Sequence, residues 1–275
     1  MKIGFLGMGN MAQAIAEGWV KKGLVAPTDM FAYAPNQEKL AANAARIGFV
    51  PMASAKACVQ ACDTVIIGCK PYQIKEVLRD LGEEVLGKSV WSIAAGWTVA
   101  TFVDTWNELG VNTDPERGAS VRGVLSIMPN TPAMVGEGVF LFEKKCTLPA
   151  EELAEAKRLF EGLGIVETMP TELMGIAGAV SGCGPAFVDL FMEAYADAAV
   201  KYGVPRPTAY KIIAQTVLGS AKLQISTGKH PGELKDAVCS PNGTTICGVA
   251  ALEKAGFRSA CIECIDAIMD KKKNG

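Results

Sequence analysis

The chain has 275 residues, 49 % of them hydrophobic and 20 % charged, and its 27 basic and 29 acidic residues give a formal net charge of −2. This length predicts two domains, with one large domain as the alternative, and the composition excludes a disordered chain. The balanced charge excludes a broad basic surface, so neither nucleic acid nor a membrane is an expected partner.

The cysteines and the uncharged stretches indicate a cytoplasmic protein. The nine cysteines are an odd number, and the sequence opens on a strand pattern without a secretory signal, which together predict reduced thiols. Cys261 and Cys264 form one C-x-x-C pair with no second pair or histidine nearby, so no metal site is expected. The longest uncharged stretch, residues 173–188, is shorter than the ~20 residues of a membrane-spanning helix.

Short apolar runs alternate with helical patterns up to about Met169, which is typical of strand–helix units in a parallel sheet. A first helix is expected over about 10–20, ended by the cations and glycine of Lys21-Lys22-Gly23. Strands are expected near residues 2–6, 30–33, 64–68, 90–93, 121–128 and 165–168. The pattern predicts an α/β fold over residues 1–169, a Rossmann-type doubly wound sheet.

After Pro170 no further β-rich run appears, so residues 170–275 are predicted to form an all-α oligomerisation domain. Its central helix, about residues 186–202, carries four charged residues at intervals of four and is otherwise almost entirely apolar: Asp189, Glu193, Asp197 and Lys201. Such a helix is expected to be buried nearly all round. A domain of this size has trouble covering it alone, so a partner subunit is expected to complete the core.

The first strand–helix junction carries the motif G-x-G-x-x-A. Gly7 permits a tight turn, Gly9 lets a pyrophosphate approach the backbone, and Ala12 allows close helix packing. The phosphates would meet the helix start at Asn10 and Met11. The motif predicts dinucleotide binding, and the alternative is a purely structural glycine turn.

The end of the second strand bears on the choice of cofactor. An NAD-preferring site usually has an acid about 20 residues after the glycines, whereas this strand runs into Tyr33-Ala34-Pro35-Asn36. Asp29 precedes the strand and is interpreted as a turn residue. NADPH is therefore allowed, with NADH as the alternative and Asn36 as a candidate contact, although no Arg stands at 34–37. The missing acid also argues against an S-adenosylmethionine methyltransferase.

Two further loops follow predicted strands on the edge where ligands bind in such sheets. They are Cys69-Lys70-Pro71 and Ala94-Ala95-Gly96, the second small enough for a nicotinamide to lie against its backbone. Lys70 is a candidate either to bind phosphate or to support its loop. The alternative for both segments is an ordinary turn.

Several segments together resemble the signature segments of pyrroline-5-carboxylate reductases. They occur in order from residue 3 to about 260, and the last is highly specific: Cys69-Lys70-Pro71, Ser92-Ile93-Ala94-Ala95-Gly96, Met128-Pro129-Asn130-Thr131-Pro132, Ser181-Gly182-Cys183-Gly184-Pro185, His230-Pro231-Gly232-Glu233-Leu234-Lys235-Asp236 and Cys239-Ser240-Pro241-Asn242-Gly243-Thr244-Thr245. The resemblance implies reduction of 1-pyrroline-5-carboxylate to L-proline by hydride transfer from NAD(P)H, the last step of proline biosynthesis.

The same resemblance implies a Rossmann domain followed by a helical domain that interlocks with a second subunit, often within a decamer. Asn130 would belong to the cofactor site, and the substrate would lie between one subunit's cofactor and its neighbour's helical domain. The chain departs from the family's pattern at five places: Cys183 replaces Ser, Phe187 replaces Tyr, Ser126 replaces Arg, Asn242 replaces Gly, and residues 111–118 form a longer connection.

The polar loop near the C-terminus is predicted to bind a small carboxylate. It precedes the apolar helical run 246–252, and unpaired N–H groups at a helix start favour an anion. Helix capping needs one hydroxyl, whereas Ser240, Thr244 and Thr245 supply three around Gly243. Capping is expected in addition, and Thr245 is the candidate catalytic residue, donating to or orienting the substrate nitrogen.

No acid–base pair is required, since a cyclic imine can arrive already protonated. His230, the single histidine, lies in a His-Pro-Gly turn that favours a structural role. A β-hydroxyacid dehydrogenase would need a general base, usually a Lys, in the helix after Ala186, and none occurs up to Val200. A noncatalytic dinucleotide sensor remains the alternative from another class, but a sensor needs no second anion site.

Overall fold

The structure, a computed structural model, describes residues 1–274 and divides into two compact units, Met1–Cys183 and Gly184–Gly275. Each unit is described by itself. The domain boundary expected after residue 169 stays a prediction.

The first unit is built on an eight-stranded sheet in the order β3-β2-β1-β4-β5-β6-β7-β8. The first six strands follow the 3-2-1-4-5-6 order of a dinucleotide-binding fold, which reverses direction beside β1. The strands are β1 (Ile3–Leu6), β2 (Met30–Tyr33), β3 (Val50–Pro51), β4 (Thr64–Ile67), β5 (Ser89–Ser92), β6 (Gly123–Met128), β7 (Gly138–Glu143) and β8 (Gly164–Met169).

The sheet is mixed, which corrects the expectation of a parallel one. β7 runs antiparallel to β6, with Ile127 opposite Phe142, and β8 then pairs parallel to β7. Only the short 3₁₀ segment η4 (Thr131–Val135) separates β6 from β7, and a connection without a crossover helix joins antiparallel strands. The sequence prediction missed β7 itself, and it also missed β3, an exposed strand of two residues that pairs with β2.

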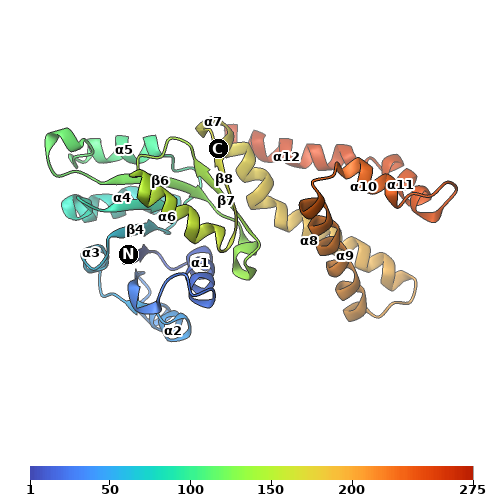
Figure 1. Ribbon diagram of the computed structural model, residues 1–275, viewed down its shortest axis with the longest axis horizontal. Helices are drawn as coiled ribbons and strands as arrows, with labels where there is room; N and C mark the ends of the chain where they lie inside the picture. Colours follow the sequence, from blue (N-terminus) through green and yellow to red (C-terminus); the bar gives the residue numbers. More distant parts are fainter. Residues whose placement is uncertain (275) are drawn as a thin grey trace. The chain divides into compact units, whose positions relative to one another are not determined.

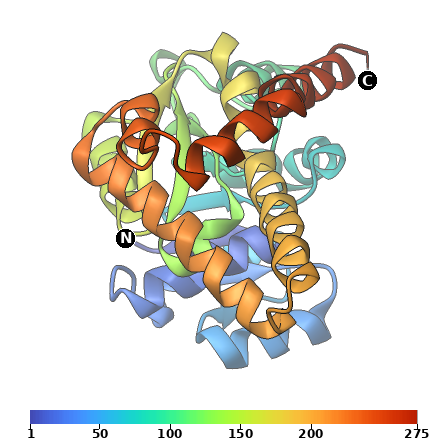
Figure 2. The same ribbon diagram turned by 90° about the vertical axis from the view of Figure 1, so that its right-hand side faces the viewer.

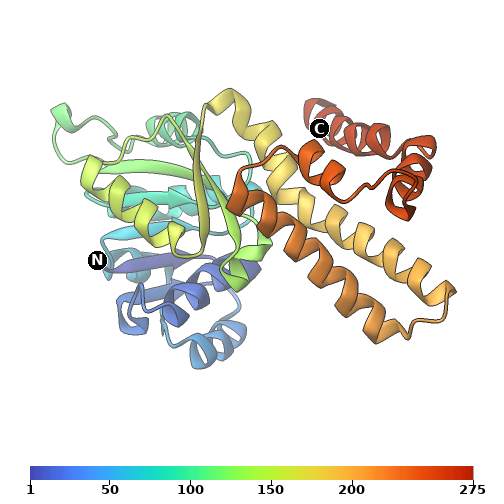
Figure 3. The ribbon, with the colours of Figure 1, turned by 45° about the vertical axis from the view of Figure 1, so that its right-hand side comes forward.

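Helices cover both faces of this sheet, as Figures 1 and 3 show. One face carries α1 (Asn10–Lys21), α2 (Gln37–Ile47) and α6 (Ala150–Glu161), and the other carries α3 (Ala55–Gln60), α4 (Pro71–Leu81) and α5 (Val99–Glu108). The first face packs fully buried aromatic rings, with Trp19 edge-on to Phe160 at 5.2 Å. The remaining 3₁₀ segments of this unit are η1 (Pro27–Asp29), η2 (Gly82–Val85) and η3 (Pro115–Arg117).

One continuous helical stretch runs over Thr171–Lys201, 31 residues. It consists of α7 (Thr171–Gly178), a π-helical turn η5 (Ala179–Cys183) and α8 (Gly184–Lys201). By length and composition alone this stretch could cross a membrane. The sequence predicted no membrane-spanning helix because only the uncharged residues 173–188 were considered, and the helix is longer than that segment. An apolar helix covered by a partner chain meets the same two criteria.

The second unit is entirely helical among its described residues. It contains α8, α9 (Arg206–Thr227), α10 (Pro231–Ala237), α11 (Thr244–Lys254) and α12 (Phe257–Asn274). α8 and α9 lie side by side (Figure 3), and Figure 2 looks onto this unit with α9 in orange and α12 in dark red.

The core of the second unit is small, with Ala196, Ala209 and Ile213 at its centre. Within the single chain α8 buries only Ala196, and Leu190 is 64 % exposed, so the expectation of a helix buried nearly all round is wrong for one chain. An apolar cavity of about 610 Å³ opens between α8 and α9, beside Tyr195 and Ile212. The exposed apolar side chains of α8 and this cavity form a surface that a partner chain could cover.

Candidate functional site

The glycine turn after β1 has the shape of a phosphate cradle. Gly7 has φ +97°, and a Cβ there would lie 2.6 Å from the backbone nitrogen of Cys69, so only glycine fits. A Cβ at Gly9 would meet nothing within 4 Å and would stand in the open space beside the turn. Gly9 is also the N-cap of α1, with no side-chain cap and no acid in the first turn. These features fit a pyrophosphate bound at the helix start.

The rest of the motif completes this cradle. Ala12 is buried, and a Cβ added to Gly68 on the neighbouring loop would lie 3.4 Å from it, so the small residue permits the close packing predicted. Asn10 is exposed and Met11 half-buried at the start of α1. The motif residues therefore surround one opening at the carboxyl end of β1.

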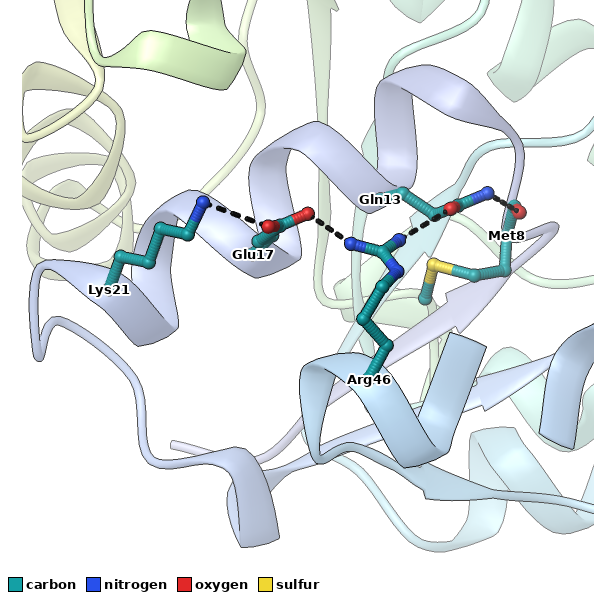
Figure 4. Close-up of polar contacts among 5 residues, drawn as sticks. All are labelled: Met8, Gln13, Glu17, Lys21 and Arg46. Atoms are coloured by element: carbon teal, nitrogen blue, oxygen red, sulfur yellow. Dashed lines mark hydrogen bonds and ion pairs between the residues drawn. The ribbon is translucent and has the colours of Figure 1, made fainter. Parts of the chain in front are cut away.

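A polar network supports the turn from the outside (Figure 4). The amide of Gln13 donates to the carbonyl of Met8 at 2.9 Å and accepts from Arg46 on α2 at 2.8 Å. Arg46 also pairs with Glu17, which in turn pairs with Lys21 one helical turn further on. Met8 lies inside the turn, so its carbonyl is held by a side chain of α1.

A cavity of about 450 Å³ adjoins the turn, and Gly7, Tyr33, Lys56 and Cys69 are among its lining residues. Lys56 lies near the start of α3, which follows the missed strand β3, so no local motif pointed to it. Asn36, a predicted cofactor contact, caps α2 by accepting from the backbone N–H of Lys39 at 2.8 Å. It lies directly after Pro35, which lines the same cavity.

The loop after β4 contributes no charged nucleophile. Burial raises the pKa of the Cys69 thiol to about 11, so it stays protonated at neutral pH. Lys70 is exposed and its backbone N–H donates to Gln73 at 3.2 Å, which supports the start of α4 at Pro71. Pro at the first helical position suits that start.

The loop after β5 is small and exposed where a ligand would approach. Ala94 is buried and its N–H donates to Ser92 at 3.3 Å, whereas Ala95 and Gly96 are exposed. Gly96 has φ +80°, a conformation that favours glycine. Since β4 and β5 are neighbours, this loop and the one after β4 lie on one edge of the sheet.

Asn130, buried at the end of β6, uses its side chain within the fold. Its Oδ1 accepts from Val139 at 2.8 Å, and its Nδ2 donates to the carbonyl of Ser181 at 3.0 Å. Ser181 lies in the π-helical turn, and its carbonyl takes this donor from outside the helix. Asn130 therefore positions β7 and this turn, and any cofactor contact would use its remaining capacity.

In the second unit the polar loop forms a β-turn. The N–H of Gly243 donates to the carbonyl of Ser240 at 3.0 Å, and Asn242 has φ +57°, the one positive φ outside glycine in the described chain. Pro241 before it fixes a negative φ, so the turn is of type II, which requires positive φ at its third residue. This explains why the family's pattern has glycine at position 242, and Asn is among the few residues that tolerate the conformation.

The turn leads directly into the start of α11. The N-cap is Gly243, with no side-chain hydrogen bond, so the expected hydroxyl cap is not formed. A Cβ at Gly243 would clash with the hydroxyl of Ser240. Thr244 and Thr245 are exposed on the first turn, and neither hydroxyl has a hydrogen-bond partner among the described residues. Uncapped N–H groups and exposed hydroxyls at one helix end suit a small carboxylate.

His230 has a structural role, as its turn predicted, because its Nδ1 accepts from the N–H of Gly232 at 3.0 Å and caps α10. All nine cysteines are free, and no cluster of three or more metal-binding side chains occurs within residues 1–274. The structure thus gathers the predicted cofactor residues at one sheet edge of the first unit. It gathers the predicted substrate residues at one helix start of the second.

Comparison with known proteins decides the family. A pyrroline-5-carboxylate reductase from Treponema pallidum is 40 % identical over 98 % of this chain and 99 % of its own length, and one from Escherichia coli is 39 % identical over 99 % and 97 %. The chain belongs to the pyrroline-5-carboxylate reductase family.

Two family models and a solved structure support the same assignment. Residues 171–275 match pyrroline-5-carboxylate reductase dimerisation, and residues 2–96 match NADP oxidoreductase, coenzyme F420-dependent. A pyrroline carboxylate reductase structure from Plasmodium falciparum with NADP bound aligns with a TM-score of 0.85 at 28 % identity, over 100 % of this chain and 97 % of that one. The reductase is thus a Rossmann-type domain followed by a helical dimerisation domain.

Proposed function

We propose that this reductase holds its substrate's carboxylate at the turn Ser240–Gly243 and the start of α11, with Thr245 at the ring nitrogen. As a family member it is an NAD(P)H-dependent oxidoreductase that reduces 1-pyrroline-5-carboxylate to L-proline, the last step of proline biosynthesis. The observation that carries the proposed roles is the uncapped start of α11 beneath two exposed threonines.

The substrate carboxylate would accept hydrogen bonds from the first backbone N–H groups of α11. Hydroxyls of Ser240 and Thr244 add donors without adding a charge. A Cβ at Gly243 would collide with the hydroxyl oxygen of Ser240, so a side chain there would displace this donor. Binding by neutral donors leaves the charge of the iminium nitrogen unopposed by a neighbouring cation.

Thr245 would hold the substrate nitrogen. The hydroxyl oxygen can accept the N–H of a protonated imine and so keep that proton on the nitrogen while the neighbouring carbon is reduced. NADPH or NADH supplies the hydride when bound. The protein's own contribution is alignment, which can supply several kcal/mol and up to about 10 kcal/mol of the barrier.

The cofactor would be held by three loops of the first unit. The glycine turn with Gly7, Gly9, Asn10, Met11 and Ala12 would receive the pyrophosphate, and Asn36 would lie near the adenosine ribose. The loops Cys69-Lys70-Pro71 and Ala94-Ala95-Gly96, with Asn130 behind them, would receive the nicotinamide half. The open cradle at Gly9 supports this assignment.

We further propose an interlocked dimer, assembled into a decamer, that works in the cytoplasm as a soluble enzyme. The exposed apolar side chains of α8 support a partner over the helical unit, and the dimerisation domain is the part of the chain that supplies it. Light scattering at micromolar concentration tests the assembly, and a monodisperse monomer would refute it.

Replacement of Thr245 by Val tests the catalytic role, because the two side chains have nearly the same shape. Loss of a hydrogen bond to a charged group is expected to lower kcat/KM for 1-pyrroline-5-carboxylate about 10- to 100-fold, with the KM for NADPH unchanged. The matched control is Thr227→Val, whose hydroxyl donates to the carbonyl of Leu223 and accepts from the N–H of Lys229, both at the end of α9. If Thr245→Val keeps its rate and substrate affinity, the role is wrong.

A further inference from the structure

Trp97 follows the small loop after β5 directly and is half-buried. We propose that Trp97 is a positioning residue for the cofactor, which fixes the loop after β5 to the loop after β4. This inference rests on the assignment of those two loops to the nicotinamide half of the cofactor. It gives a role to a side chain that the reaction itself does not use.

The two loops are joined by the indole of Trp97. Its Nε1–H donates to the carbonyl of Pro71 at 3.1 Å, and Pro71 is the first residue of α4. The backbone carbonyl of Trp97 accepts from the hydroxyl of Ser126 on β6 at 2.8 Å. Trp97 itself follows β5, and its two hydrogen bonds connect it to the segment after β4 and to β6. These three strands are neighbours in the sheet.

The ring also has a fixed support. Its centroid lies 4.9 Å from that of Phe102, which is fully buried on α5, and Phe102 in turn packs against Trp106 at 5.5 Å. Aromatic packing of this kind holds the indole plane while the N–H reaches the neighbouring loop. A phenylalanine at position 97 would keep the packing and lose only the hydrogen bond.

The loop needs such a support because its own residues offer little. Ala95 and Gly96 are exposed, and neither has a side chain long enough to reach another segment. The position of this backbone relative to Lys70 and Pro71 would otherwise depend on the β5–α5 connection alone. Small errors in the placement of reacting groups are costly, so a loose loop would weaken cofactor binding and slow the reaction.

The test compares Trp97→Phe with Trp106→Phe in the full-length oligomer. Trp106 packs against the same phenylalanine, but its buried Nε1 has no partner among the described residues, so its replacement breaks no hydrogen bond. We expect Trp97→Phe to raise the Kd for NADP⁺ in calorimetry, and the KM for NADPH, about 2- to 10-fold. The KM for 1-pyrroline-5-carboxylate should change less, and Trp106→Phe should bind NADP⁺ like the parent.

Ser126→Ala provides a second variant that leaves the indole in place. Because Ser126 acts on Trp97, its effect on NADP⁺ affinity should have the same direction, and the double variant should show less than the summed effect. Equal NADP⁺ affinity in Trp97→Phe and the parent would overturn the inference, and so would equal losses in Trp97→Phe and Trp106→Phe. If the parent enzyme binds NADP⁺ but does not reduce the substrate, the proposed function is refuted and the inference about Trp97 still stands.

Discussion

Gln13 donates its side-chain amide to the backbone carbonyl of Met8, 2.9 Å away, and so ties the first turns of α1 to the interior of the glycine turn (Figure 4). Arg46 fixes the orientation of that amide from α2. The glycine turn is thus held by a side chain as well as by its own backbone.

Replacement of Gln13 by Leu should therefore weaken cofactor binding. We expect the Kd for NADP⁺ to rise about 2- to 10-fold, because one net hydrogen bond to the turn is lost. The control is Lys21→Met, which removes only the ion pair with Glu17 at the far end of the network. Equal affinity in the parent and in Gln13→Leu, measured by calorimetry, would contradict the role of Gln13.

The same network predicts a pH dependence. Lys21 first, and Arg46 next, hold the pKa of Glu17 below its ordinary value of 4.5. Since the folded state binds this proton less readily than the unfolded state, the contribution is complete above about pH 4.5 and is lost as the pH falls through the folded pKa. Glu17→Gln should cost under ~1 kcal/mol of unfolding free energy at pH 7. A difference that persists undiminished at pH 3 in urea titrations would speak against these pairs.

Lys56 should favour NADPH over NADH. It is the one cation among the described residues that line the cavity beside the glycine turn, and Glu76 and Asp80 also line that cavity. Lys56→Met should lower kcat/KM for NADPH about tenfold, since a charge-assisted bond to the 2′-phosphate is lost, and leave NADH almost unaffected. Lys75→Met, which removes an ion pair with Glu108 outside the cavity, serves as the control. A ratio of the two cofactors that does not move in Lys56→Met would exclude the contact.

Position 242 should tolerate glycine and reject branched residues. At φ +57° a residue with a Cβ costs roughly 1–2 kcal/mol, and Asn pays less than most. Asn242→Gly should keep stability and substrate KM near the parent values, whereas Asn242→Val should raise the substrate KM by distorting the turn before Gly243. Thermal unfolding and steady-state kinetics of both variants check this, and a Val variant as active as the Gly variant would show that the turn is not required.

The sequence predicted the structure best where a local backbone conformation or a close contact requires a particular residue type. Gly7 and Ala12 identified the cradle after β1, since each residue type is required by its immediate neighbours. The long pattern of apolar positions likewise identified six of the strands, to within a few residues at their ends.

Long-range relationships were the part that could not be predicted. β7 was not among the predicted strands, and its antiparallel direction follows from the short connection through η4. Lys56 lines the cavity beside the glycine turn because of the fold and not because of a motif. The hydrogen bond of Trp97 to Pro71 likewise joins residues whose contact depends on the pairing of β4 with β5.

The Asn242–Gly243 peptide has a further chemical consequence. In an Asn–Gly pair, the glycine nitrogen can attack the side-chain amide carbonyl and release ammonia to form a succinimide, which water then opens to an aspartate or isoaspartate. The new carboxylate would stand at the start of α11 and repel the substrate's own. Stored protein would then lose its hold on the substrate while it still binds NADP⁺.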